Sequence, residues 1–135
     1  MEELLASSTA TAKNIMNVPD AQEMCNLCAL VHHVLQPLRD ELKQPIKISS
    51  GFRSKALNAA VGGVNNSQHT LGQAVDISID GDMNYASRIV AIIRAKCDFD
   101  QLIFEHNAKG THWVHVSYRS DGQNRKQYIP NLLKR

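Results

Sequence analysis

One ten-residue segment constrains this chain more than any other: Ser67-Gln-His-Thr-Leu-Gly-Gln-Ala-Val-Asp76. It places His69 in a polar stretch and Asp76, seven positions later, inside an apolar run that is typical of a buried β-strand. A charged carboxylate is costly to bury in such a strand unless it is paired or bound to a metal ion. We therefore interpret Asp76 as a metal ligand held by a rigid strand. The alternative is that Asp76 only accepts hydrogen bonds from loop amides.

A second segment, His112-Trp-Val-His115, supplies another imidazole about forty residues further on. Strand alternation puts Trp113, His115 and Ser117 on one face. A lone histidine in a strand is more often a hydrogen-bonded core residue. With His69 and Asp76 available to complete a set, we interpret His115 as the third ligand. Three nitrogen and oxygen ligands, with a fourth position left to water, are the usual coordination of catalytic zinc.

Length and composition restrict the classes of protein to consider. With 135 residues, the chain is predicted to form one domain over residues 1–135, with a single core. The net charge of +2 and the 5% content of aromatic residues argue against a nucleic-acid-binding face. The first residues lack a secretory signal, and no stretch is long enough to span a membrane. We therefore expect a protein that is cytoplasmic as synthesised, and a monomer.

The three cysteines form an odd, sparse set that suits a reducing compartment. Cys25 and Cys28 make a CxxC pair, which is also found in zinc ribbons and redox sites. No second CxxC follows, and the surrounding residues have helical apolar spacing. We therefore expect buried thiols on a helix face.

The periodicity predicts helices that come first and then strands mixed with helices, which is an α+β pattern with a small, mostly antiparallel sheet. A helix is expected from Pro19 to about Leu42, kinked or ended early by Pro37. Further helices are expected at 54–60 and 84–96, and strands at 46–50, 73–79, 101–104 and 113–118.

Several motifs together resemble a known family. They are Ser49-Ser-Gly-Phe-Arg-Ser54, Leu57-Asn58, Val61-Gly-Gly63, Ser67-Gln-His-x-x-Gly-x-Ala-x-Asp76 and Trp113-Val-His-Val-Ser117. In this order and register, from about residue 7 to residue 118, they resemble the zinc D-Ala-D-Ala carboxypeptidase family, peptidase family M15. That family includes D-Ala-D-Ala carboxypeptidases and L-Ala-D-Glu endopeptidases of phages and bacteria.

The resemblance implies a fold, a metal and a substrate. The fold would be the Hedgehog/DD-peptidase-like zinc peptidase fold, and the metal would be Zn²⁺ bound by His69, Asp76 and His115. The substrate would be the stem peptides of peptidoglycan. Arg53 matches the family's arginine, which grips a substrate carboxylate or the polarised carbonyl oxygen. Ser67 and Gln68 flank the first ligand and are candidates for substrate binding.

The general base is predicted less sharply, and two residues compete for it. Many relatives carry a carboxylate three positions before the last ligand, where this chain has His112. Glu105 follows in the run Asp100-Gln-Leu-Ile-Phe-Glu105, which similar relatives share. Spacing slightly favours His112, with Glu105 either the base itself or a residue that orients an imidazole.

Two functions from different classes follow. The first is a zinc peptidase that cuts cell-wall peptides, as a phage or prophage endolysin or a virion part would after release. The second is a non-catalytic module that binds zinc or muropeptide, because a lost carboxylate at the base position is typical of a degenerate enzyme. Neither the bond that is cut nor the choice between endopeptidase and carboxypeptidase follows from the sequence.

Overall fold

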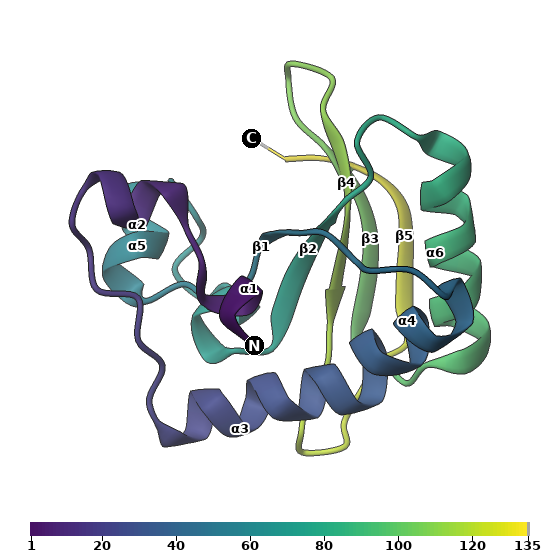
Figure 1. Ribbon diagram of the computed structural model, residues 1–135, viewed down its shortest axis with the longest axis horizontal. Helices are drawn as coiled ribbons and strands as arrows, with labels where there is room; N and C mark the ends of the chain where they lie inside the picture. The colour runs from purple at the N-terminus through teal and green to yellow at the C-terminus, as the bar shows by residue number, and fades with distance from the viewer. Residues whose placement is uncertain (135) are drawn as a thin grey trace.

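The computed structural model describes residues 1–134, shown in Figure 1. In chain order, the elements are α1 (Glu2–Leu5), α2 (Ser8–Ala12), α3 (Ala21–Leu30), the π-helical turn η1 (Val31–Leu35), α4 (Gln36–Leu42), β1 (Ile48–Ser50), α5 (Lys55–Ala60), the 3-10 turn η2 (Gln68–Leu71), β2 (Ala74–Ser78), α6 (Met83–Lys96), β3 (Gln101–His106), β4 (His112–Ser117) and β5 (Gln127–Leu133). The predicted α+β class is confirmed.

The long predicted helix is present as three consecutive segments, α3, η1 and α4. It begins at a capping box in which Asp20 accepts from the Glu23 amide and the Glu23 side chain accepts from the Asp20 amide. Pro37 lies in the first turn of α4, directly after the π-helical turn. A proline inside a helix removes one amide donor and crowds the preceding turn. The wider π-helical turn accommodates it, so the helix continues to Leu42.

The cysteine pair lies on α3, as predicted, but the expectation that its thiols are buried is wrong. Cys25 and Cys28 are both exposed. The buried side of α3 is formed by Asn26, Leu27 and Leu30. The two cysteines are three residues apart and therefore share a different side of the helix.

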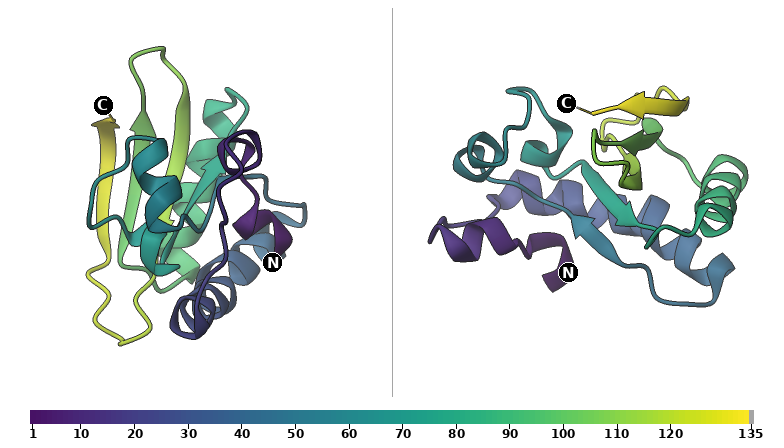
Figure 2. Two further views of the ribbon diagram at one scale, coloured as in Figure 1. Left: turned by 90° about the vertical axis from the view of Figure 1, so that its left-hand side faces the viewer. Right: turned by 90° about the horizontal axis from the view of Figure 1, so that it is seen from above.

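The five strands form one sheet in the order β1-β2-β4-β3-β5. One face carries Val75, Ile77, Val114, Val116 and Leu102, which pack with apolar residues of α3, η1, α4 and α6 into one core. Figure 1 shows α3 and α4 below the sheet and α6 on its right, while α2 and α5 lie together at the opposite end. The view from above in Figure 2 (right) shows the same separation. Because strand side chains alternate, the other face of the sheet is left for polar residues.

The sheet is mixed, which corrects the expectation of a mostly antiparallel one. The pairs β1–β2, β2–β4 and β4–β3 are antiparallel, but β5 runs parallel to β3. The chain reverses after β4 and returns beside β3 rather than β4. Since β3 and β4 are antiparallel, a strand that runs opposite to β4 must run parallel to β3.

The last strand, β5, was not predicted, because Pro130 interrupts its sequence pattern. Proline is tolerated only on edge strands or at irregularities in pairing. Here both conditions hold: β5 is an edge strand, and its register with β3 shifts between Ile103 and Glu105, opposite Pro130.

Within residues 1–134, none of the helices combines the length and the apolar character that crossing a bilayer requires.

Candidate metal centre

The three predicted ligands meet on the sheet face that points away from the core. Asp76 of β2 and His115 of β4 are direct cross-strand partners, and η2 brings His69 to them. One donor atom from each residue lies within 4.8 Å of the others, and all three residues are buried. The alternation of β2 explains this placement, since Val75 and Ile77 point into the core and Asp76 points to the opposite side.

The protonation of His69 follows from its hydrogen bond to Gly51. His69 Nδ1 lies 2.8 Å from the Gly51 carbonyl oxygen, which can only accept, so Nδ1 carries the proton. Nε2 then has a lone pair, and burial lowers the pKa of His69, which favours the neutral ring. Gly51 is required here because a Cβ at this position would collide with the backbone of Leu4.

Asp76 stays ionised in this position. Burial by itself would raise the pKa of its carboxyl, but His69 and His115 outweigh that effect and hold the pKa well below its usual range. Asp76 Oδ1 lies 2.9 Å from His115 Nδ1 and 3.3 Å from His69 Nε2.

These contacts leave one pair of atoms unmatched. His69 Nε2 is buried and has no hydrogen-bond partner among the described residues, although a carboxylate oxygen lies 3.3 Å away. Two lone pairs facing each other at this distance repel unless a cation lies between them. The donor set of two imidazoles and one carboxylate is a zinc-type set, and the hydrogen bond from Nδ1 to a backbone carbonyl is the usual outer support of a metal-binding histidine. The residues present therefore fit a zinc ion.

Glu105 lies next to this cluster. It belongs to β3, is 3% exposed, and its Oε1 lies 3.5 Å from His115 Nδ1. The indole nitrogen of Trp113 donates to the same oxygen at 3.1 Å. This places a buried carboxylate, fixed in orientation, on the same face as the three ligands.

The structure does not bring His112 to the cluster. It lies on the same strand as His115, three positions earlier. Because side chains on a strand alternate, residues an odd number of positions apart point to opposite faces of the sheet. Its Nδ1 lies 2.9 Å from the Gly110 carbonyl oxygen, and its ring lies against those of His106 and Phe104. Of the two residues considered for the base, Glu105 is the one that faces the ligands.

Arg53 enters the site from the turn after β1. Its backbone amide donates to the His69 carbonyl, and Asn17 braces the adjacent residues by bonding to Phe52 and Ser54. Arg53 as a whole is 9% exposed, and its Nε has no hydrogen-bond partner among the described residues. Burial lowers the pKa of Arg53, while the charges of Asp76 and Glu105 oppose that shift. A buried, partly unpaired guanidinium is suited to bind an anionic or carbonyl group of a ligand.

A pocket of about 410 Å³ opens onto these residues. Its lining includes Arg53, Asp76 and Trp113. The N-terminal residues 6–9 form one wall, and Gly62, Gly63, Asn107 and Lys134 contribute to the others.

Comparison with known proteins agrees with this geometry. A family model described as Peptidase M15 matches residues 1–117, most of the chain. The chain belongs to the Peptidase M15 family. A search of curated proteins found no match. Peptidases of this family are zinc-dependent, which is consistent with the buried group formed by His69, Asp76 and His115.

In this M15 peptidase, Ser67 and Gln68 make hydrogen bonds within the protein. Ser67 Oγ accepts from the His69 amide and so caps η2. Gln68 Nε2 donates to Asp100 at 3.0 Å and to Gln73 at 3.3 Å. The structure therefore uses both side chains to shape the turn that carries His69, and neither lines the pocket.

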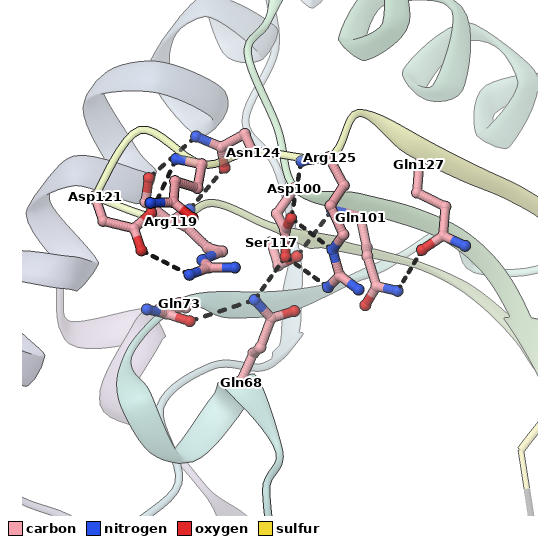
Figure 3. A network of polar contacts seen from close by, with 11 residues as sticks. Gln68, Gln73, Asp100, Gln101, Ser117, Arg119, Asp121, Asn124, Arg125 and Gln127 are labelled. Atoms are coloured by element: carbon pink, nitrogen blue, oxygen red, sulfur yellow. Dashed lines mark hydrogen bonds and ion pairs between the residues drawn. The ribbon is translucent and has the colours of Figure 1, made fainter.

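Asp100 is the centre of the network in Figure 3 and was missed by sequence reasoning. Its buried carboxylate accepts two bonds from the Arg125 guanidinium, at 2.8 and 2.9 Å, besides the one from Gln68. The Arg125 hydrogen bonds lower the pKa of Asp100 to about 2, against the effect of burial. Through Gln68, this network connects the turn that carries His69 to the C-terminal segment. In the sequence, the signal that could have pointed to Asp100 was its place at the start of the run 100–105, which was considered for Glu105 alone.

Proposed function

We propose that this M15 protein is a zinc peptidase that hydrolyses peptide bonds in the stem peptides of peptidoglycan. The main support is the unmatched pair formed by His69 Nε2 and Asp76 Oδ1, with His115 beside it. Three buried candidate ligands, of which Asp76 lines an open pocket, are typical of a catalytic site rather than a structural one. We also propose that the fold is of the Hedgehog/DD-peptidase kind.

The residues of this chain have separate tasks in the proposed reaction. His69, Asp76 and His115 would hold a zinc ion, which would supply Lewis-acid chemistry to the scissile carbonyl and to a water molecule. Glu105 takes the proton from that water and delivers it to the leaving amine. Arg53 holds a carboxylate or the carbonyl oxygen of the substrate. Trp113 and the buried surroundings of Glu105 keep its carboxylate pointed at the site.

The substrate assignment rests on the family and on the pocket. Peptidoglycan peptides are the substrate class of the carboxypeptidases and endopeptidases that the motifs resemble. We propose that the protein acts on the cell wall after release, as an endolysin of phage or prophage origin would.

The test is a digest of purified peptidoglycan by the zinc-loaded protein, followed by mass spectrometry of the muropeptides. A peptidase produces new amino termini at one defined bond, and the masses identify that bond. The matched control is Glu105→Gln, which keeps the size of the side chain and removes the base. If zinc-loaded protein releases no more amino termini than peptidoglycan incubated with the metal-stripped protein, the chain is a binding module and the proposed activity is wrong.

A further inference from the structure

The C-terminal strand brings a second cation to the pocket. Lys134 follows β5, outside residues 1–117 that the family model matches. Its amide donates to the His106 carbonyl, which fixes the backbone at the end of β3. Its Nζ lies 3.8 Å from Glu105 Oε2, and its side chain is 35% exposed and lines the pocket. The ammonium group is therefore reachable from solvent and close to the reacting centre.

Sheet order places the two cations of the pocket on opposite sides of the ligands. Arg53 follows β1 at one edge of the sheet, and Lys134 follows β5 at the other. Asp76 and His115 lie on β2 and β4, between those edges. A peptide bound with its scissile bond at the ligands would extend toward Arg53 in one direction and toward Lys134 in the other.

The charges lining the pocket favour an anionic ligand. Among its described residues the charged ones are Arg53, Lys134 and Asp76, and the Asp76 oxygen already faces two histidines. Glu105, beside Lys134, is a second carboxylate and already accepts a hydrogen bond from the Trp113 indole. With both carboxylates engaged within the protein, Arg53 and Lys134 are the charged groups left to meet a ligand, and a bound metal ion would add positive charge.

We propose that Lys134 is a specificity-determining residue that binds a substrate carboxylate, so that the pocket selects peptides carrying a carboxylate on each side of the scissile bond. This inference rests on the proposed peptidase function and names the charge pattern of its substrate. A lysine presents three donors on a flexible stem and can contact a carboxylate while remaining near Glu105.

The competing explanation is that Lys134 only pairs with Glu105. Such a role would alter Glu105 in the same way for every substrate. A specificity role would instead depend on one particular carboxylate of the ligand. A double-mutant cycle, which changes Lys134 and that carboxylate singly and together, distinguishes the two explanations.

The test measures binding of four versions of the peptide L-Ala-γ-D-Glu-L-Lys-D-Ala. One has both its carboxylates free, two have one converted to the carboxamide, and one has both converted. Trp113 is the single tryptophan of the chain and lines the pocket, so its fluorescence reports binding directly. The full chain is titrated without metal, so that nothing is cut, and again with zinc for cleavage rates. Lys134→Gln is compared with Lys96→Gln, which makes the same charge change on the exposed surface of α6.

We expect Lys134→Gln to weaken binding of the dicarboxylate peptide roughly tenfold, the loss of one charge-assisted hydrogen bond near the surface. One of the two single amidations should abolish that difference, and Lys96→Gln should show none. An equal loss for all four peptides, or no loss for any, would overturn the proposal. Because binding is read without turnover, failure to cut any bond would count against the peptidase function and leave the charge selectivity to be judged separately.

Discussion

His69 Nε2 and Asp76 Oδ1 face each other at 3.3 Å without a proton to share, because the ring proton of His69 is donated to Gly51. Burial lowers the pKa of His69, which favours the neutral ring, and the pKa of Asp76 lies well below its usual range. A divalent cation bound at this pair would remove the repulsion. It would also supply the zinc-dependent peptide hydrolysis on which peptidases of this family rely. A single residue pair therefore connects the local structure to the proposed activity.

Glu105→Gln should abolish turnover while zinc stays bound, because Glu105 is the carboxylate that faces the ligands. Loss of a general base costs on the order of 10²–10⁴ in kcat. His112→Ala should remain active, since His112 lies on the other face of β4. Both variants are assayed side by side on one muropeptide, with zinc content measured in each. Loss of activity in His112→Ala alone would restore His112 as the base.

Arg53→Lys should lower kcat/KM by roughly tenfold or more and leave zinc content unchanged. The substitution keeps the charge and loses the two-pronged geometry that grips a carboxylate or a carbonyl oxygen. Arg94→Lys on the exposed side of α6 is the matched control. Steady-state kinetics that are identical for both variants would show that Arg53 does not contact the substrate.

The buried cluster of the three candidate ligands was predictable from the sequence, and the position of Glu105 beside it was not, for a physical reason. His69, Asp76 and His115 follow from the cost of burying a carboxylate and from two histidines at suitable positions. His112 was favoured on sequence spacing from His115, yet an interval of three on a strand points the two side chains to opposite faces. The contact between Glu105 and His115 depends on the register of β3 against β4, which one sequence does not display.

At the scale of the elements, the C-terminal segment reaches the site through a chain of side-chain contacts. Arg125 fixes Asp100, Asp100 accepts a hydrogen bond from Gln68, and Gln68 precedes the candidate metal ligand His69. This chain of contacts joins residues that lie far apart in the sequence, and local periodicity gives no sign of it. Local periodicity also fails to predict β5, because Pro130 interrupts its strand pattern. The strand tolerates this proline because it lies at the sheet edge and its pairing with β3 is irregular there.

Arg125→Ala should destabilise the protein by roughly 2 kcal/mol near neutral pH, the usual worth of hydrogen bonds to a charged group. The pKa of Asp100 is lowered to about 2 in the folded protein, from an ordinary value of 3.8. Its pairing with Arg125 therefore stabilises the fold in full at pH values above that ordinary pKa. That stabilisation is lost as the pH falls from about 4 toward 2. The difference in unfolding free energy between wild type and variant should therefore shrink over this range.

Urea unfolding at several pH values measures this difference. The control is Arg119→Ala, which breaks an ion pair with Asp121 in the same loop, where the aspartate is exposed. Exposed pairs contribute little, so that variant should change the stability by less than about 1 kcal/mol. A stability difference for Arg125→Ala that does not vary with pH would contradict the role assigned to Asp100.

At the scale of the whole molecule, the two faces of the sheet have different roles: one packs into the core that stabilises the fold, and the other carries the proposed site. Its core face packs with α3, η1, α4 and α6, and its other face carries the ligands, Glu105 and the pocket. Substitutions of the ligands should therefore leave the fold intact. The α+β class and most helices and strands were predictable from periodicity, but the mixed sheet was not, because strand order depends on where the chain returns.

The central claim is that His69, Asp76 and His115 together bind one catalytic zinc ion. The most direct measurement is elemental analysis of zinc in the purified, chelator-stripped and reloaded chain and in three variants, His69→Ala, Asp76→Ala and His115→Ala. Circular dichroism on the same samples checks that each variant is folded. We predict about one zinc per chain for the wild type, as a single set of three ligands requires, and far less for each variant. Zinc near one per chain in all three folded variants would contradict the claim.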